Sequence, residues 1–392
     1  MMQVYLDNNA TTHAEPAVAE AMLPYLTELF GNPSSAHGVG GEVAAALRTA
    51  RAQVKALLGA AFEQEVMFCS GGTEANNTAI HVALETMAGR DEIVTSAVEH
   101  PAILAPLAWA RKRLGVKVHH IPVDGAGRLD MAAYRAALGP RTALVSFMWA
   151  NNETGTLFPV GELASLAKAA GALFHTDAVQ AVGKLPMSLK ESEIDLLSLS
   201  GHKLHGPKGI GALYVRKGLA FQPLLRGGHQ ERGRRAGTEN VPGIIGMGVA
   251  ATLVDPVDWP RMAALRDRLE AGILAAVPCS QVNGDVANRL PNTSNIAFED
   301  VDGEAVLHAL AKAGIAASSG SACTSGSMEP SHVLRAMDLP LRALHGAVRF
   351  SLSPRTSAGE IEHVIEVLPG LVAAARERSP LWADRQKELG FV

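Results

Sequence analysis

The central part of the chain, from about residue 62 to 215, alternates short apolar runs with longer segments of helical periodicity. The apolar runs are rich in Val, Ile, Leu and Phe, and several are apolar nearly throughout, which is typical of strands covered on both faces. We predict strands at 65–69, 92–98, 117–123, 143–150, 172–178, 194–200 and 211–217. Helices are expected at 73–88, 102–115 and 160–171, the last two ending at a glycine. This alternation predicts an α/β fold with a mostly parallel sheet flanked by helices.

The pattern changes near residue 255, where the turn-rich stretch DPVDWP joins two parts of the chain. After it, Leu265, Leu269 and Ile273 recur every fourth residue, which predicts an amphipathic helix at 261–278. The remainder indicates a smaller α+β domain. The expected organisation is an N-terminal segment that packs with the small domain (1–14), a large domain (15–257) and a small C-terminal domain (258–392).

Composition narrows the class of protein. The chain has 392 residues, 47% of them hydrophobic, and a formal net charge of −4, which favours neither nucleic acid nor an anionic membrane as partner. No apolar run reaches the roughly 20 residues that span a bilayer. The start of the chain lacks the features of a signal peptide, so we expect a cytoplasmic protein. Three dispersed cysteines, without CxxC or HExxH spacing, predict neither a disulfide framework nor a metal site.

In an open parallel sheet, ligands bind beyond the carboxyl ends of the strands. The first such position carries CSGGTEANN, in which Gly71 and Gly72 allow a tight turn and Thr73 is expected to cap the following helix. Free N–H groups and the helix dipole would make a phosphate cradle there. A plain capped turn without a ligand is the alternative for this motif taken alone.

Other strand ends carry further polar groups. Asp177 ends a predicted buried strand. Its carboxylate either caps the N-terminus of a helix or pairs with a cationic ring nitrogen of a ligand. Lys203 follows another predicted strand and lies beside a Gly-rich loop. It is either a solvated surface charge or a desolvated lysine that acts as a nucleophile. His100 and Asn152 stand at two more strand ends. Together with the cradle, these are the groups that pyridoxal phosphate requires.

The order of motifs along the chain also resembles a known family. YLDNNATT, SGGTEANN, VEHPA, NNETG, HTDAVQ, SGHK, GGHQERGRRAGTEN and SSGSACTSGS resemble the motifs of the NifS/IscS-type cysteine desulfurases, closest to the nitrogen-fixation NifS branch. The resemblance covers nearly the whole chain. It implies the fold-type I architecture of pyridoxal-phosphate enzymes, a homodimer, and conversion of L-cysteine to L-alanine with sulfur supplied to iron–sulfur cluster assembly.

The same resemblance assigns roles to individual residues. It implies that Lys203 binds the cofactor covalently, that Asp177 pairs with the ring nitrogen and that His100 stacks on the ring. The remaining residues expected at the cofactor are Gly72, Thr73, Asn152, Gln180, Ser200, His202 and, from the neighbouring subunit, Thr238. The residues expected at the substrate are Asn8, Asn152 and Arg349.

Cys323 lies in SSGSACTSGS, a Gly/Ser-rich stretch in which a packed structural cysteine is unexpected. The resemblance implies that its thiolate takes the substrate sulfur as a persulfide and passes it to an iron–sulfur scaffold protein of the NifU or IscU type. A selenocysteine lyase or another fold-type I enzyme is the alternative function. GMGVAA at 246–251 fits a dinucleotide fingerprint, but no predicted strand precedes it, so we do not expect an oxidoreductase. Cys69 and Cys279 are expected to be structural.

Overall fold

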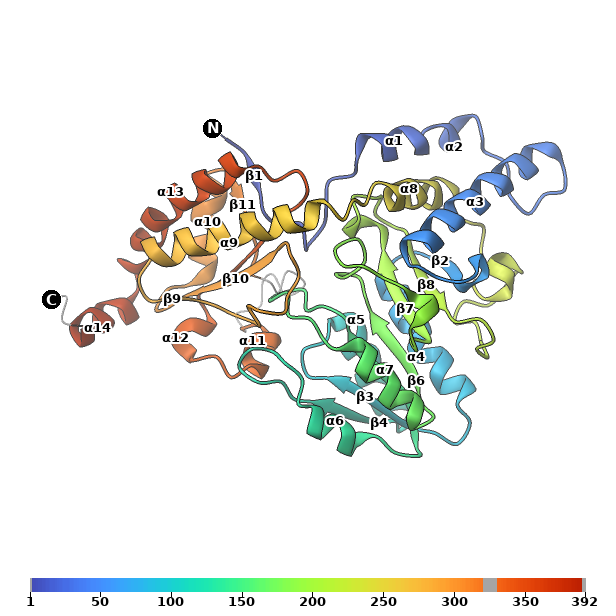
Figure 1. The fold of residues 1–392 in the computed structure, drawn as a ribbon, viewed down its shortest axis with the longest axis horizontal. Coiled ribbons are helices and arrows are strands. Elements are labelled where there is room, and N and C mark those ends of the chain that lie inside the picture. Colours follow the sequence, from blue (N-terminus) through green and yellow to red (C-terminus); the bar gives the residue numbers. More distant parts are fainter. Residues whose placement is uncertain (1, 320–329, 390–392) are drawn as a thin grey trace.

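The computed structural model describes residues 2–319 and 330–389, which form a large lobe and a smaller lobe side by side (Figure 1). The large lobe contains a seven-stranded sheet with the order β2-β8-β7-β6-β5-β3-β4. Its strands are β2 (Val66–Cys69), β3 (Glu92–Ser96), β4 (Lys117–Ile121), β5 (Thr142–Met148), β6 (Leu173–Asp177), β7 (Leu196–Ser200) and β8 (Gly211–Val215). Only β8 runs antiparallel to its neighbours within this sheet. The carboxyl ends of the other strands therefore share one edge.

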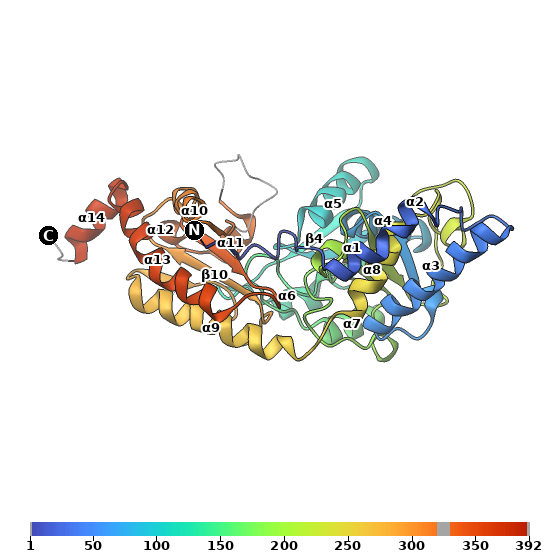
Figure 2. The same cartoon turned by 90° about the horizontal axis from the view of Figure 1, so that it is seen from above.

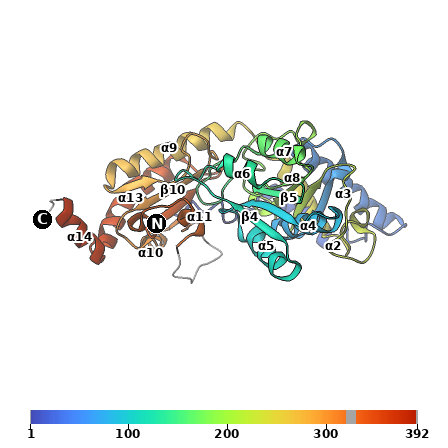
Figure 3. The same ribbon diagram turned by 90° about the horizontal axis from the view of Figure 1, so that it is seen from below.

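Helices cover both faces of this sheet, as Figure 3 shows. Alternate residues of β2 point to opposite faces: Val66 and Phe68 pack with the helices α3, α6, α7 and α8, whereas Met67 and Cys69 pack with α4. The helices of the large lobe are α1 (Pro16–Met22), α2 (Pro24–Thr27), α3 (Gly38–Leu57), α4 (Gly72–Thr86), α5 (Pro101–Leu114), α6 (Met131–Ala137), α7 (Val160–Ala169) and α8 (Val241–Thr252). Short 3₁₀ turns are η1 (Glu63–Glu65), η2 (Leu189–Glu191), η3 (Gly201–Lys203) and η4 (Gln230–Gly233).

The small lobe has its own sheet and core. Its antiparallel sheet has the order β12-β10-β9, and its helices α9, α10 and α13 pack their apolar sides against it. The elements are α9 (Asp258–Ala276), β9 (Ser280–Val282), β10 (Thr293–Phe298), α10 (Gly303–Lys312), β11 (Ile315–Ala316), α11 (His332–Ala336), α12 (Leu341–Leu344), β12 (Ala347–Ser351), α13 (Ala358–Arg376) and α14 (Pro380–Leu389). Figure 2 shows α14 at the end of this lobe that is remote from the large lobe.

The N-terminal segment belongs to the small lobe in space. The strand β1 (Val4–Tyr5) pairs in parallel with β11, and Val4 and Leu6 are buried in the core of the small lobe. The chain then crosses to α1 on the large lobe (Figure 1). Asn8, Asn9 and Thr12 are buried along this crossing. The segment therefore lies between the two lobes.

The predicted fold class is confirmed: a mostly parallel sheet flanked by helices, with a smaller α+β lobe. Each of the seven predicted strands is present with ends shifted by a few residues. The stretch DPVDWP was expected to be a join, but α9 already begins at Asp258, because a proline in the first helical turn loses no hydrogen bond. The domain boundaries 1–14, 15–257 and 258–392 stay a prediction. Within the described residues, no helix is long and apolar enough to cross a membrane.

Candidate active site

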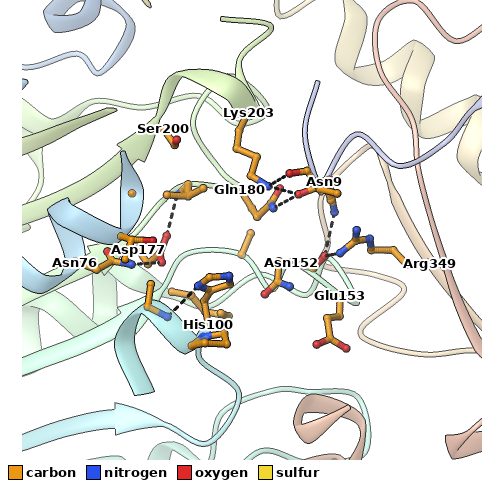
Figure 4. Close-up of a pocket in the computed structure, with 18 of the residues that line it drawn as sticks. Asn9, Asn76, His100, Asn152, Glu153, Asp177, Gln180, Ser200, Lys203 and Arg349 are labelled. Carbon is orange, nitrogen blue, oxygen red and sulfur yellow. Dashed lines mark hydrogen bonds between the residues drawn. The ribbon is translucent and has the colours of Figure 1, made fainter. Parts of the chain in front are cut away.

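A cavity of about 400 Å³ lies at the carboxyl edge of the large sheet. Its wall combines residues of both lobes and of the N-terminal segment: Asp177 and Lys203 follow strands of the large sheet, Arg349 comes from β12, and Asn9 comes from the crossing segment. Figure 4 shows these side chains directed toward one space. A cavity of this size takes a small-molecule ligand.

One end of the cavity is formed by the N-terminus of α4. Gly72 and Thr73 belong to its first turn, whose N–H groups have no partner within the helix and carry the positive end of the helix dipole. Gly72 is required by close packing, since a Cβ there would lie 2.7 Å from Cγ2 of Val179. The expected helix cap at Thr73 is wrong, because the N-cap is Gly71, which has no side chain to bond. The turn can still receive a phosphate.

Asp177 lines the cavity near this turn. Its Oδ2 accepts a hydrogen bond of 2.7 Å from Nδ2 of Asn76, and its Oδ1 accepts one of 3.0 Å from the main-chain N–H of Val179. Asp177 is 7% exposed and lines the cavity. Two donors thus hold a buried carboxylate in place, where it can pair with a cationic nitrogen of a ligand.

Lys203 enters the cavity from η3, immediately after β7. Its Nζ donates to the main-chain oxygen of Ala10 over 2.6 Å and also to that of Asn9. Nδ1 of the neighbouring His202 shares a hydrogen bond of 3.1 Å with Oγ1 of Thr11, and its direction depends on the tautomer of the ring. Burial, together with Lys203 and Lys208, lowers the pKa of His202 to about 4. His202 is therefore neutral at pH 7, and Lys203 is held by main-chain carbonyls.

His100 forms the floor of the cavity beside Asp177. It is the N-cap of α5, and its Nδ1 accepts a hydrogen bond of 3.1 Å from the main-chain N–H of Ala102. Burial lowers the pKa of His100, Asp177 opposes this shift, and Lys203 and His332 add to it. The acceptor role at Nδ1 leaves the proton of the neutral ring on Nε2. The ring is thus a fixed, neutral donor beside the ligand space.

The small lobe contributes Arg349, which is 2% exposed. Its Nη2 donates to Oδ1 of Asp7 over 2.7 Å and its Nη1 donates to the main-chain oxygen of Asn152 over 3.0 Å. These contacts fix a guanidinium in the cavity wall, next to Asn152. A planar cation of this kind suits a carboxylate ligand.

Several predicted site residues need separate mention. Ser200 and Gln180 line the cavity together with the groups above. Asn8 does not: it lines a second cavity, and its Nδ2 donates to the main-chain oxygen of Ser351 over 2.9 Å. Its neighbour Asn9 lines the first cavity, since the chain turns at residues 8–10 and the two side chains face different cavities. Asn8 therefore lies apart from the other residues predicted at the substrate, and its contact with substrate stays a prediction.

One further predicted residue that the structure describes is not at the cavity. Thr238 is exposed and does not line it. Cys323 lies outside the described residues. The two other cysteines are described: burial raises the pKa of Cys69 to about 12, and Cys279 is half-buried behind α9. A thiol with so high a pKa is inert at pH 7, as expected for a structural cysteine.

The sequence did not single out four buried residues near the cavity: Asn9, Asn76, Glu153 and Lys184. Asn9 and Asn76 lie within the motifs NNATT and TEANN. These motifs marked the two segments, but they did not indicate a function for either asparagine. Glu153 lines the cavity and accepts a 2.5 Å hydrogen bond from Ser331, and burial raises its pKa. Lys184 gave no signal, because isolated lysines are usually at the surface.

The donor set of the cavity fits pyridoxal phosphate. A helix N-terminus suits the phosphate, the Asp177 carboxylate suits a protonated ring nitrogen, and the Lys203 amine suits the aldehyde. Close packing of Gly72 on Val179 brings the first turn of α4 against the segment that follows Asp177.

Comparison with known proteins shows the family to which the chain belongs. Residues 4–364 match the family described as Aminotransferase class-V. A protein from Gluconacetobacter diazotrophicus named cysteine desulfurase is 64% identical over 386 residues, covering 97% of this chain and 96% of that protein. The cysteine desulfurase NifS of Azotobacter vinelandii is 58% identical over 386 residues, covering 98% and 96%.

Among solved structures, one described as a NifS-like protein matches with a TM-score of 0.89 at 35% identity, covering 95% of this chain and 100% of that chain. A second, described as a NifS-like protein from Rickettsia africae, matches with a TM-score of 0.84 at 30% identity, covering 95% and 100%. The chain therefore belongs to the class-V aminotransferase family and, within it, to the cysteine desulfurases.

Proposed function

We propose that the cavity between the two lobes is the active site of a cysteine desulfurase that depends on pyridoxal phosphate and converts L-cysteine to L-alanine. The observation that carries this proposal is the arrangement around one space of an amine, a carboxylate, a helix N-terminus and a guanidinium. When bound, pyridoxal phosphate supplies a cationic ring that stabilises negative charge on the α-carbon of the substrate. The other steps fall to side chains of the protein.

The proposed cofactor contacts combine the residues that line the cavity with the roles that the family resemblance implies. The N–H groups of Gly72 and Thr73, with Ser200 and His202 nearby, would hold the phosphate. Asp177 would keep the ring nitrogen protonated, since a buried carboxylate is stabilised by a cationic partner. The His100 ring would cover one face of the cofactor, and Gln180 would lie near the ring oxygen.

The proposed substrate contacts are those of Arg349 and Asn152. Arg349 would bind the carboxylate of L-cysteine, which leaves the amino group at the Lys203 side of the cavity (Figure 4). Lys203 would then remove the α-proton as a general base, and His100, as a neutral donor, would return a proton to the product. The Cys323 thiolate would attack the substrate sulfur: the new S–S bond forms as the C–S bond breaks, and protonation of the carbon gives L-alanine.

We also propose a homodimer. Apolar side chains are exposed between the end of α1 and the start of α3: Leu23, Leu26, Phe30 and Val39, with Phe30 75% exposed. Burying such a group between two subunits is favourable. A dimer would also give Thr238 a role that it lacks in the single chain, as a contact to the phosphate in the partner subunit's cavity.

The sulfur acceptor belongs to the same proposal. An iron–sulfur scaffold protein of the NifU or IscU type would take the persulfide sulfur from Cys323, in the cytoplasm and without nucleic acid or a membrane as partner. A role in nitrogen fixation rests on the likeness to the Azotobacter vinelandii NifS.

The decisive experiment compares two cysteine variants of the purified holoenzyme. After incubation with L-cysteine, mass spectrometry should find the added sulfur on a peptide that contains Cys323. Cys323→Ala should abolish alanine formation and keep the visible absorbance of the cofactor, whereas Cys279→Ala, the matched control, should keep both. A Cys323→Ala protein with normal activity would refute the proposed sulfur carrier. Lys203→Ala should lose the visible absorbance that depends on the covalent link.

A further inference from the structure

Lys184 is a buried lysine in the turn that follows β6. It is 8% exposed, and its Nζ donates to Oε1 of Gln180 over 2.9 Å and to Oδ1 of Asn9 over 3.4 Å. Helical turns at Ala178 and Ala181 place Gln180 and Lys184 on the same side of the chain. The lysine amine therefore bonds to two residues that line the active-site cavity, although Lys184 itself does not line it.

Asn9 connects Lys184 to Lys203. The side-chain oxygen of Asn9 accepts from Lys184, and the main-chain oxygen of the same residue accepts from both Lys203 and Nε2 of Gln180, the latter over 2.9 Å. Asn292 adds a donor to the same side-chain oxygen over 3.1 Å. Lys184, Gln180, Asn9 and Lys203 thus form one continuous hydrogen-bond network.

This network decides which end of the Gln180 amide faces the cavity. The Lys184 amine carries N–H donors in both its protonated and its neutral form, and it donates to the oxygen of the Gln180 amide, which turns the amide nitrogen away. The nitrogen then donates toward Asn9 at the cavity wall. Without Lys184, either end of the amide could face the ligand.

The charges around Lys184 are mostly positive. Burial, with smaller contributions from the nearby cations Lys203 and Arg349, lowers the pKa of Lys184 to about 7. Among the described residues, no carboxylate makes a hydrogen bond or ion pair with Lys184. The second cavity, of about 290 Å³, is lined by both lysines, by His205 and by three acids. Two of these acids are paired elsewhere, Glu15 with Arg355 and Asp258 with Arg261, and Asp255 bonds to the main chain of Val257.

We propose that Lys184 is a positioning residue for the cofactor: it orients the Gln180 amide and the Asn9 carbonyl so that N–H donors face the ring oxygen and the Lys203 amine is held in place. The inference rests on the proposed function, because it assigns Gln180 and Lys203 to the cofactor. It adds a residue that touches neither substrate nor cofactor space.

The test compares Lys184→Met, which keeps the length of the side chain and removes the donors, with Lys184→Arg, which keeps donors and charge. Trp259→Phe is the matched control, because Trp259 lines the same second cavity and its Nε1 donates to Gly183 over 3.1 Å outside the network. The measurements are the loss of cofactor from diluted holoenzyme, the pH titration of its visible absorbance, kcat and KM for L-cysteine, and the melting temperature.

Lys184→Met should weaken cofactor binding by roughly three- to tenfold, the effect of one hydrogen bond. The midpoint of the visible titration should move to higher pH, because removing a nearby cation favours protonation at Lys203. Lys184→Arg should keep cofactor binding and the titration midpoint close to those of the unaltered protein. Trp259→Phe should change only the melting temperature.

The proposal is overturned if Lys184→Met lowers the melting temperature but leaves cofactor loss and the titration midpoint as in Trp259→Phe. Should Lys184→Met not fold, Lys184→Gln serves instead, and an unchanged midpoint in that variant overturns the proposal as well. Failure of the proposed function is seen separately: the unaltered protein would then show neither a cofactor band nor activity on L-cysteine.

Discussion

The buried ion pair between Arg51 and Glu231 offers a quantitative test of how the large lobe is held together. Arg51 on α3 donates to Oε1 and Oε2 of Glu231 over 2.7 and 2.8 Å, and the side chains are 9% and 3% exposed. Oε2 of Glu231 also accepts from the main-chain N–H of Phe68 over 3.1 Å. The pair therefore joins α3, β2 and η4, at the start of the loop that leads to Thr238.

Replacing Glu231 by Ala leaves the Arg51 guanidinium buried without its partner. Breaking one side of a buried pair costs roughly 3–5 kcal/mol. We expect the lower end, about 3 kcal/mol, because Arg51 keeps a hydrogen bond of 2.6 Å to the Val66 oxygen and lies 4.7 Å from the centre of the Phe68 ring. The loss should be measured as the free energy of unfolding in urea, with the cofactor at saturation.

The matched control is Glu162→Ala, which removes the partner of Arg135 in an exposed pair with side chains 49% and 52% exposed. Such pairs contribute about 0–1 kcal/mol. The double variant Arg51→Met with Glu231→Leu should recover much of the lost stability, since apolar residues of similar size replace buried pairs well. A loss for Glu231→Ala no larger than that for Glu162→Ala would refute the reasoning.

Three further predictions concern the substrate, the sheet and the pH dependence. Arg349→Ala should raise KM for L-cysteine roughly ten- to hundredfold, the effect of a lost charge-assisted hydrogen bond of about 1.5–3 kcal/mol, and steady-state kinetics with an unchanged KM would contradict it. Gly211→Ala should cost about 1–3 kcal/mol of unfolding free energy, because its Cβ would lie 2.6 Å from Cα of Gly71; urea unfolding equal to that of the unaltered protein would contradict this. Burial lowers the pKa of His175 from 6.5 to about 3. Between these pH values the unfolded chain binds a proton at His175 that the folded chain does not bind. The free energy of unfolding therefore falls by up to about 1.4 kcal/mol for each pH unit as the pH drops through this range. His175→Gln should make this decline shallower, and an identical slope would show that His175 is not its source.

Most strands of the large sheet were predictable because they are buried on both faces and read as apolar runs; the exception is the edge strand β4, which is mostly exposed or half-buried. The direction of β8 was not, since the apolar run at 211–217 carries no information about which way it pairs. The two-residue strands β1 and β11 were also invisible, because their pairing depends on contacts between distant parts of the chain. Local patterns predict elements, and only packing determines such pairings.

The candidate site shows the same division. Residues that follow strands, such as Asp177 and Lys203, could be found from their positions alone, and the resemblance gave them roles. The sequence does not reveal that Asn9 lines the first cavity and Asn8 the second, because this depends on how the crossing segment packs between the two lobes. Lys184 was missed because burial of a lysine depends on neighbours that its own sequence context does not reveal.

The place of the N-terminal segment has a consequence for how the protein is made. Asn8 bonds to Ser351, a residue 343 positions later in the chain. During synthesis, domains generally fold from the N-terminus as they leave the ribosome. Here the first strand must wait for β11 and β12, so Asn9 cannot take its place beside Lys203 until translation is almost complete. A nascent chain that stops before the small lobe is therefore expected to have the large sheet without a finished catalytic site.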